Sequence, residues 1–163
     1  MRDGYKFLLA SPPPKSKTLL GLGFLLSPWA QRCYIDHNIF SDRIMSVSFT
    51  GEVCTHIVTC HSPTNVSTDL EVEQFYADLT TCVRSFPPHD IVAIAGDLNA
   101  HLGKNTCNTN AYYECTNRNG QHLLDFAQEN AFTIGWLKFN KKSSKKVTWT
   151  APNGQLHQND HIL

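Results

Sequence analysis

The sequence has no excess of positive or negative charge. Fourteen Lys and Arg residues balance fourteen Asp and Glu residues, so the formal net charge at pH 7 is zero. A protein that binds nucleic acid through its overall electrostatic field is strongly basic, and this chain is not. Any contact with nucleic acid must therefore come from a local patch of basic side chains.

The chain also lacks C-x-x-C pairs and an apolar run long enough to cross a bilayer. Its six cysteines are widely spaced, and several lie in apolar stretches. We therefore expect reduced, mostly buried thiols of an intracellular protein, nuclear or cytoplasmic, with a disulfide framework or a zinc site as the less favoured alternative. The apolar residues 18–26 follow Lys15 and Lys17 as in a signal peptide, but they are too short to span a membrane. A core strand is the better interpretation, and we expect no membrane partner.

No internal repeat or low-complexity tract interrupts the 163 residues, of which 41% are hydrophobic and 17% charged. This composition is typical of a globular chain, and the length is that of one domain with a substantial core.

The most informative stretch is the apolar run at residues 91–95, which stops at Gly96-Asp97-Leu98-Asn99. A short continuous run of this kind predicts a strand buried on both faces, in the middle of a sheet. Asp97 and Asn99 project on the same side if the chain stays extended. A carboxylate and an amide suit a hard cation and a water directed at a phosphate. The alternative is an Asp and an Asn that cap a turn.

Other segments supply the remaining elements of a mixed fold. A capping box, Thr68 with Glu71, precedes apolar residues at helical spacing up to Phe86, and a second helix is expected at residues 121–130. Residues 36–38 and 141–146 are expected to be turns, and residues 11–16 and 101–120 loops. Strands are expected at residues 5–9, 21–26, 32–35, 44–49, 53–60, 132–134 and 147–150. This order predicts an α/β fold, a layered sandwich with mixed sheets.

Four motifs in order make the sequence similar to a known superfamily. They are Gly21-x-Gly23 to Ser27 with Ser41 to Ile44, His61-Ser62-Pro63-Thr64, Gly96 to Ala100, and Thr148-Trp149-Thr150 leading to Asp160-His161. Together they resemble the endonuclease/exonuclease/phosphatase superfamily, in the branch of retrotransposon endonucleases and craniofacial-development-protein-2-like proteins.

The resemblance implies a four-layered α/β sandwich of two mixed β-sheets flanked by helices. It also implies hydrolysis of phosphodiesters in nucleic acid with Mg²⁺, or Mn²⁺, as cofactor. By position, Asp97 would orient the attacking water and bind the metal, Asn99 would hold the scissile phosphate, and Asp160 would complete the metal site. His61 takes the place of the family's tyrosine, which contacts the phosphate or the leaving group.

Departures from the family pattern weaken this expectation. The family's early metal-binding glutamate and its final Asp-His pair do not occur in the 163 residues, Asn159 stands at a core-facing position, and His161 replaces a tyrosine. We therefore expect residues 1–163 to be a partial domain without the family's first strands and last strand, with weakly bound metal and reduced or no activity. The alternative is a non-catalytic remnant that binds nucleic acid or protein. An uncovered sheet edge also predicts self-association.

Two further features have open interpretations. The lysines at positions 138, 141, 142, 145 and 146 either bind a nucleic-acid backbone or form a solvated hairpin tip. Trp149 is expected in the core, with a platform for base stacking as the alternative.

Overall fold

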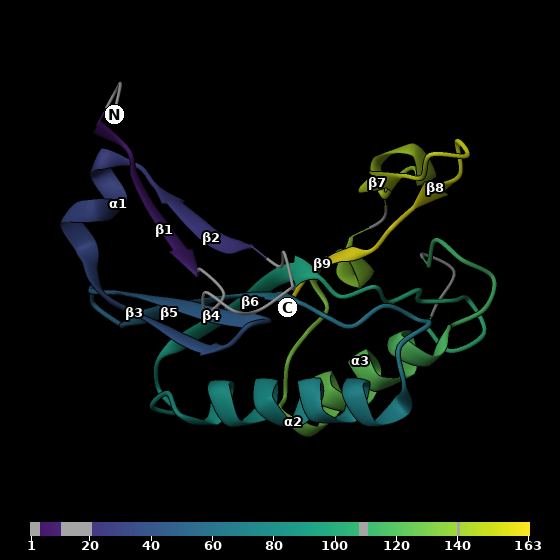
Figure 1. The fold of residues 1–163 in the computed structure, drawn as a ribbon, viewed down its shortest axis with the longest axis horizontal. Coiled ribbons are helices and arrows are strands. Elements are labelled where there is room, and N and C mark those ends of the chain that lie inside the picture. Colours follow the sequence, from purple (N-terminus) through teal and green to yellow (C-terminus); the bar gives the residue numbers. More distant parts are fainter. Residues whose placement is uncertain (1–3, 11–20, 108–110, 140) are drawn as a thin grey trace, which may run out of the picture. The chain divides into compact units, whose positions relative to one another are not determined.

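The computed structural model describes residues 4–10, 21–107, 111–139 and 141–163 (Figure 1). The loop expected at residues 11–16 lies outside the described residues. The chain divides into two compact units, one of Met1–His61 with Asp78–Ile94 and one of Ser62–Ala77 with Ala95–Leu163. Helix α2 (Asp69–Arg84) begins in the second unit and ends in the first, and strand β6 (Ile91–Asp97) does the reverse.

In the first unit, a two-stranded sheet packs against a larger one. Strands β1 (Lys6–Ala10) and β2 (Leu22–Leu26) pair antiparallel, close to the two strands expected there. Their inner side chains form one apolar cluster with residues of β4 (Ile44–Phe49): Leu8, Ala10, Leu22, Leu26, Met45 and Val47. Apolar faces of two sheets are thus buried against each other, which is the arrangement of a sandwich.

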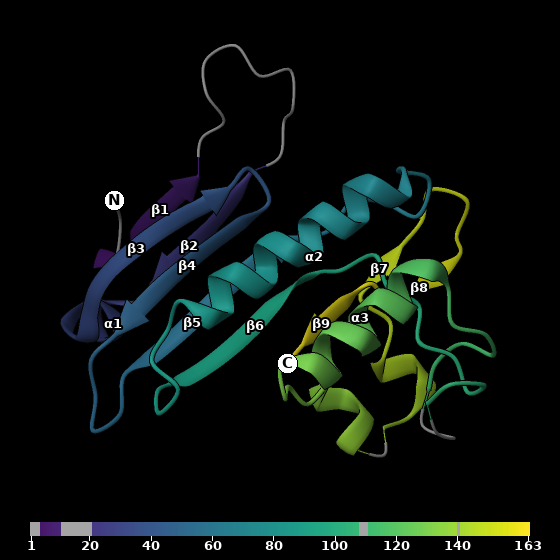
Figure 2. The same cartoon turned by 90° about the horizontal axis from the view of Figure 1, so that it is seen from below.

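The larger sheet has five strands in the order β3-β4-β5-β6-β9. Strand β3 spans Tyr34–Ser41, β5 spans Thr55–His61 and β9 spans Asp160–Ile162. β6 lies between β5 and β9, as expected of an interior strand, and β5 is connected to β6 through α2 (Figure 2). The predicted mixed α/β class is confirmed. β6 is not buried on both faces along its length, because Ile94 is fully buried but Ile91 is 55% exposed.

Helix α2 follows the sequence pattern closely. The backbone N–H of Thr68 donates to Glu71 Oε2 at 2.8 Å, and the N–H of Glu71 donates to Thr68 Oγ1 at 3.3 Å, which is the predicted capping box. The helix buries most of the residues expected from the apolar spacing, but Leu70, the first of them, is 74% exposed. The buried ones are Val72, Phe75, Tyr76, Leu79, Cys82 and Val83. Its first half contacts α3 (Arg118–Glu129) in the second unit, where the Tyr76 and His122 rings stack with centroids 5.7 Å apart.

Four sequence-based boundaries are wrong. A helix, α1 (Pro28–Cys33), occupies the start of the strand expected at residues 32–35, because Ser27 Oγ caps it by accepting the N–H of Ala30. β3 continues through the turn expected at residues 36–38, since these residues pair with β4. α3 begins within the expected loop because Asn117 Oδ1 caps it by accepting the N–H of Gly120. The strand expected at residues 132–134 is not formed, and the 3-10 helix η2 (Gly135–Lys138) follows directly.

The C-terminal part of the second unit contains short elements. They are the 3-10 helix η3 (Ser143–Lys145) and the antiparallel strands β7 (Trp149–Thr150) and β8 (Leu156–His157), followed by β9. Trp149 is 47% exposed, so the expectation that it lies in the core is wrong.

The cysteines are less buried than their apolar surroundings suggest. All six are free thiols, but only Cys60 and Cys82 are buried, and Cys115 is exposed. Among the described residues, no helix combines the length and apolarity needed to cross a membrane.

Candidate functional site

The two candidate metal-binding carboxylates come from neighbouring strands of the second unit. Asp97 ends β6 and Asp160 begins β9, and the two residues stand directly opposite each other in an antiparallel ladder. The next pair along the ladder is hydrogen-bonded, because the N–H of Leu98 donates to the carbonyl of Asn159 at 2.9 Å. Pairs alternate along such a ladder, so Asp97 and Asp160 form a non-hydrogen-bonded pair, with Cα atoms about 4.5 Å apart and side chains on one face.

This register has an electrostatic consequence. Like charges directly opposite each other on a sheet destabilise it, and nearby cations offset that effect. Asp97 is half-buried and Asp160 is exposed, so a cation can reach the pair from solvent. Across the described residues, no group of three or more His, Cys, Asp or Glu side chains is arranged to hold a metal. Two carboxylates fit Mg²⁺, which commonly takes one or two protein carboxylates and fills its other positions with water and substrate phosphate.

Asn99 lies in a turn and does not continue the strand. Its φ of +47° is in the left-handed region, which Asn adopts more readily than most residues. The N–H of Asn99 donates to Asp97 Oδ1 at 2.9 Å, so the two side chains do not project from one extended segment as expected. Asp97 therefore caps a turn that contains Asn99, as the alternative interpretation of this pair predicted. A carboxylate has about four lone-pair sites, so this bond leaves Asp97 with further capacity to bind a cation.

Asn99 also connects the ends of two chain segments. Its side-chain Nδ2 donates to the carbonyl of Ser62 at 3.0 Å, and the N–H of Ser62 donates to the carbonyl of Asp97 at 2.9 Å. Asn117 Nδ2 in turn donates to the carbonyl of Asn99 at 3.3 Å. The Asn99 amide is thus held in one orientation beside Asp97.

His61 belongs to the first unit, whereas the three other candidate residues belong to the second. It is the last residue of β5 and is half-buried. Its N–H donates to the carbonyl of Arg43 at 3.0 Å, and its own carbonyl accepts Arg43 Nη1 at 3.2 Å. These contacts fix its backbone, and its part in a site with Asp97 stays a prediction.

Residues at the start of α3 support the segment that leads from Ser62 into α2. Asn119 is fully buried, and its Nδ2 donates to the carbonyl of Pro63 at 2.8 Å. Arg118 Nη1 donates to Asp69 Oδ1 at 2.7 Å and to the carbonyl of Ser67 at 2.8 Å. No sequence pattern pointed to this role, because both residues stand in a stretch that was expected to be a loop.

His161 is a neutral structural residue. Trp136 Nε1–H donates to His161 Nδ1 at 2.8 Å, so the ring proton sits on Nε2, which donates to the carbonyl of Ala100 at 2.8 Å. Burial lowers the pKa of His161 to about 4. The side chain that replaces the family's tyrosine therefore anchors β9 to the turn after β6.

A group of aromatic rings from the loop after β6 and from β8 was not found from the sequence. The His101 ring stacks on Tyr113 with ring centroids 4.0 Å apart, and the centroid of the His157 ring lies 5.6 Å from that of His101. Burial lowers the pKa of His101, and His157 adds to that shift, while the Asn159 side chain acts in the opposite direction. Asn159 Oδ1 is buried and has no hydrogen-bond partner of good geometry among the described residues. Asn159 is thus a polar residue at a core-facing position with one hydrogen-bond acceptor left unsatisfied, which costs stability.

Comparisons with known proteins bear on the fold and its relatives. No family profile matches the chain. The chain is 29% identical over 148 residues to craniofacial development protein 2 of Tragulus javanicus and 28% identical to that of Bos taurus. Each match covers 88% of this chain, and 26% and 25% of the respective relative, so the chain spans about a quarter of their length.

Two solved structures have the same fold. A humanized D. rerio TDP2 matches with a TM-score of 0.60 at 14% identity, over 98% of this chain and 60% of that one. D. rerio TDP2 complexed with a single-strand DNA product matches with a TM-score of 0.57 at 15% identity, over 98% and 61%. The chain is thus similar to craniofacial development protein 2 over most of its length, as the sequence resemblance predicted. It shares its mixed α/β fold with the two TDP2 structures.

Proposed function

We propose that this chain carries part of a divalent-metal-dependent phosphodiester hydrolase site of the endonuclease type, with nucleic acid as the substrate class. The observation that carries the proposal is the cross-strand pairing of Asp97 with Asp160. Two carboxylates held on one face of a ladder repel each other, and a bound Mg²⁺ or Mn²⁺ removes that repulsion.

Each residue has a distinct part in this proposal. Asp97 and Asp160 would hold the metal, which when bound supplies charge stabilisation at phosphorus. Asp97 would also orient the attacking water. The amide of Asn99, held by its bond to the Ser62 carbonyl, would contact the scissile phosphate. His61 would contact the phosphate or the leaving group from the end of β5.

Nucleic acid as the substrate is supported by the TDP2 structure that was solved with a single-strand DNA product. We treat residues 1–163 as a partial domain of the family. The family's metal-binding glutamate and final Asp-His pair do not occur among these residues, and each such group typically contributes about 10²-fold to 10⁴-fold. We therefore expect weak metal binding and little or no turnover from the 163-residue chain by itself.

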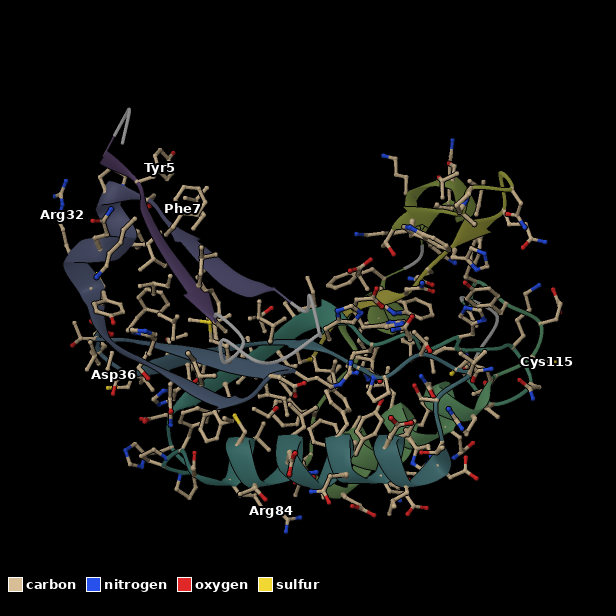
Figure 3. All side chains as sticks on the ribbon, in the orientation of Figure 1. Tyr5, Phe7, Arg32, Asp36, Arg84 and Cys115 are labelled. Atoms are coloured by element: carbon tan, nitrogen blue, oxygen red, sulfur yellow. The ribbon has the colours of Figure 1, made fainter. Side chains whose placement is uncertain are left out.

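Isothermal titration of the chain with Mg²⁺ tests the proposal directly. We expect measurable binding that is lost in Asp97→Asn and in Asp160→Asn. Asp36→Asn is the matched control, because Asp36 is exposed on β3 in the first unit (Figure 3). Equal Mg²⁺ affinity in all four proteins would overturn the site. Plasmid cleavage with Mg²⁺, measured in parallel, reports any turnover and its dependence on Asp97.

The second candidate function is a non-catalytic module that binds nucleic acid or protein. It is favoured by the lack of a third metal-binding side chain near the pair within the described residues. Nucleic-acid binding without Mg²⁺ binding, and without cleavage, would select this function.

A further inference from the structure

The lysine-rich segment after α3 borders a cavity of about 290 Å³ in the second unit. Its lining combines three lysines, two aromatic residues and one acidic residue: Lys141, Lys145, Lys146, Trp136, Phe139 and Asp160. This volume is close to the lower end for small-molecule sites, about 300 Å³. Cations, aromatic surface and one carboxylate thus meet in one hollow.

Two exposed lysines, Lys141 and Lys145, outnumber the one carboxylate, so they give the cavity a local positive charge in a chain whose net charge is zero. Lys146 is only 7% exposed, and a lysine is rarely buried to this extent. Lys138, from the same run of lysines, borders a different and larger cavity beside α3. The run is therefore not a uniform solvated tip, because only some of its members face the first cavity. This is a local basic patch of the kind that nucleic-acid binding needs in a chain without net charge.

The apolar part of the cavity is accessible from solvent. Phe139 is 61% exposed although it borders the cavity, and Ile162 of β9 is 63% exposed at the same place. Cations that contact phosphates, combined with aromatic rings on which bases stack, are the two components of single-strand nucleic-acid binding. A base can stack on such a ring only when it is unpaired, since a base in a duplex has no free face.

Asp160 joins this cavity to the candidate site. It borders the cavity and is also the residue opposite Asp97 in the ladder. A ligand in the cavity therefore lies next to the carboxylate pair. We propose that the cavity is a subsite for the unpaired nucleotide adjacent to the scissile phosphate, with Lys141 and Lys145 contacting the backbone and Phe139 stacking on the base. This inference rests on the proposed function, because a phosphate beside the carboxylate pair is scissile only if that pair acts in hydrolysis.

The subsite is tested by binding in the absence of metal, so that turnover plays no part. Fluorescence anisotropy with a labelled oligothymidine is measured in EDTA over a series of salt concentrations. We expect Lys141→Gln with Lys145→Gln to weaken binding and to reduce the slope of log K against log salt by about 0.7 for each phosphate that is no longer neutralised. The matched control is Lys138→Gln with Lys142→Gln, which removes the same charge from the same segment outside this cavity.

The aromatic wall has its own variant and control. Phe139→Ala is expected to weaken binding about ten-fold without changing the salt slope, because stacking on a base is not a counterion effect. Trp29→Ala is the control, since Trp29 is 72% exposed on α1 in the first unit. Both aromatic side chains are exposed, so neither variant is expected to unfold the chain.

Two results would overturn the subsite. One is an equal decrease of affinity and slope in both lysine double variants, which would mean diffuse attraction to a charged surface. The other is equal binding of a duplex and a single strand of the same length. Failure of the proposed function looks different: Mg²⁺ titration is then the same in the wild-type chain and Asp97→Asn, while binding to oligothymidine in EDTA still depends on Lys141, Lys145 and Phe139.

Discussion

Trp136 donates its indole N–H to Nδ1 of His161 at 2.8 Å, and this contact keeps the imidazole neutral inside the second unit. The opposite ring nitrogen is used by the carbonyl of Ala100. Protonation would place a second hydrogen on Nδ1, facing the Trp136 N–H, so the charged ring loses a hydrogen bond as well as its hydration.

Stability should therefore fall on acidification. The folded pKa of His161 is about 4, below its ordinary value of 6.5, so the unfolded chain takes up this proton first. The stabilisation is fully present above pH 6.5 and is lost as the pH falls from 6.5 to about 4, by up to about 3 kcal/mol. Urea unfolding in EDTA between pH 7.5 and pH 4.5 measures it.

Comparison with a variant isolates this histidine from the carboxylates that titrate in the same range. His161→Gln should have a lower free energy of unfolding at pH 7.5 and a weaker dependence on pH. His89→Gln is the control, because the His89 side chain is 82% exposed. Parallel pH profiles in the wild-type chain and His161→Gln would contradict the prediction.

Asp160→Asn should raise stability in the absence of metal but abolish the stabilisation by Mg²⁺. Without metal, removal of the charge opposite Asp97 is expected to raise the free energy of unfolding by about 0.2–1 kcal/mol, because cross-strand repulsion is relieved. With Mg²⁺, the wild-type chain should gain stability through binding to the folded state, whereas the variant should not. Thermal denaturation in EDTA and in a saturating concentration of Mg²⁺ checks both. A variant that is less stable than wild type in EDTA would argue against repulsion between the two side chains.

Cys82 should be inert in the folded chain. Burial raises the pKa of its thiol to about 12, so almost no thiolate is present at neutral pH, and its side chain is fully buried on α2. Cys115 is exposed (Figure 3) and should react first with a thiol reagent. Mass mapping after brief alkylation measures the order, and Cys115→Ser should remove the fast phase. Modification of Cys82 at the rate of Cys115 under native conditions would contradict its burial.

Self-association is the prediction that the sheet edge suggested, and β3 and β9 are the outer strands of the five-stranded sheet. The smaller sheet adds an exposed apolar face. Tyr5, just before β1, and Phe7 on β1 are 42% and 56% exposed (Figure 3). Leu9, at the next alternate position, is 64% exposed, and Leu25 pairs opposite Phe7. We expect association at high protein concentration that Phe7→Ser reduces. Size-exclusion chromatography over a wide range of protein concentration measures it, and an unchanged monomer throughout would refute it.

Local patterns in the sequence were sufficient for several elements. The capping box and the apolar spacing after Thr68 predicted α2, and the alternation of Ile44 to Phe49 predicted β4. The order of motifs around Asp97 and Asp160 was enough to indicate the similarity to craniofacial development protein 2. These signals are local because helix capping, side-chain period and motif order depend on neighbours along the chain.

Only the tertiary structure decided how distant segments meet. In the structure Asp97 lies opposite Asp160, and Asn99 lies in a left-handed turn with its side chain bonded to Ser62. Trp149 is exposed. Lys138 borders a different cavity from Lys141, Lys145 and Lys146. Cross-strand register and burial depend on which segments far apart in the sequence pack together, and no local propensity contains that information.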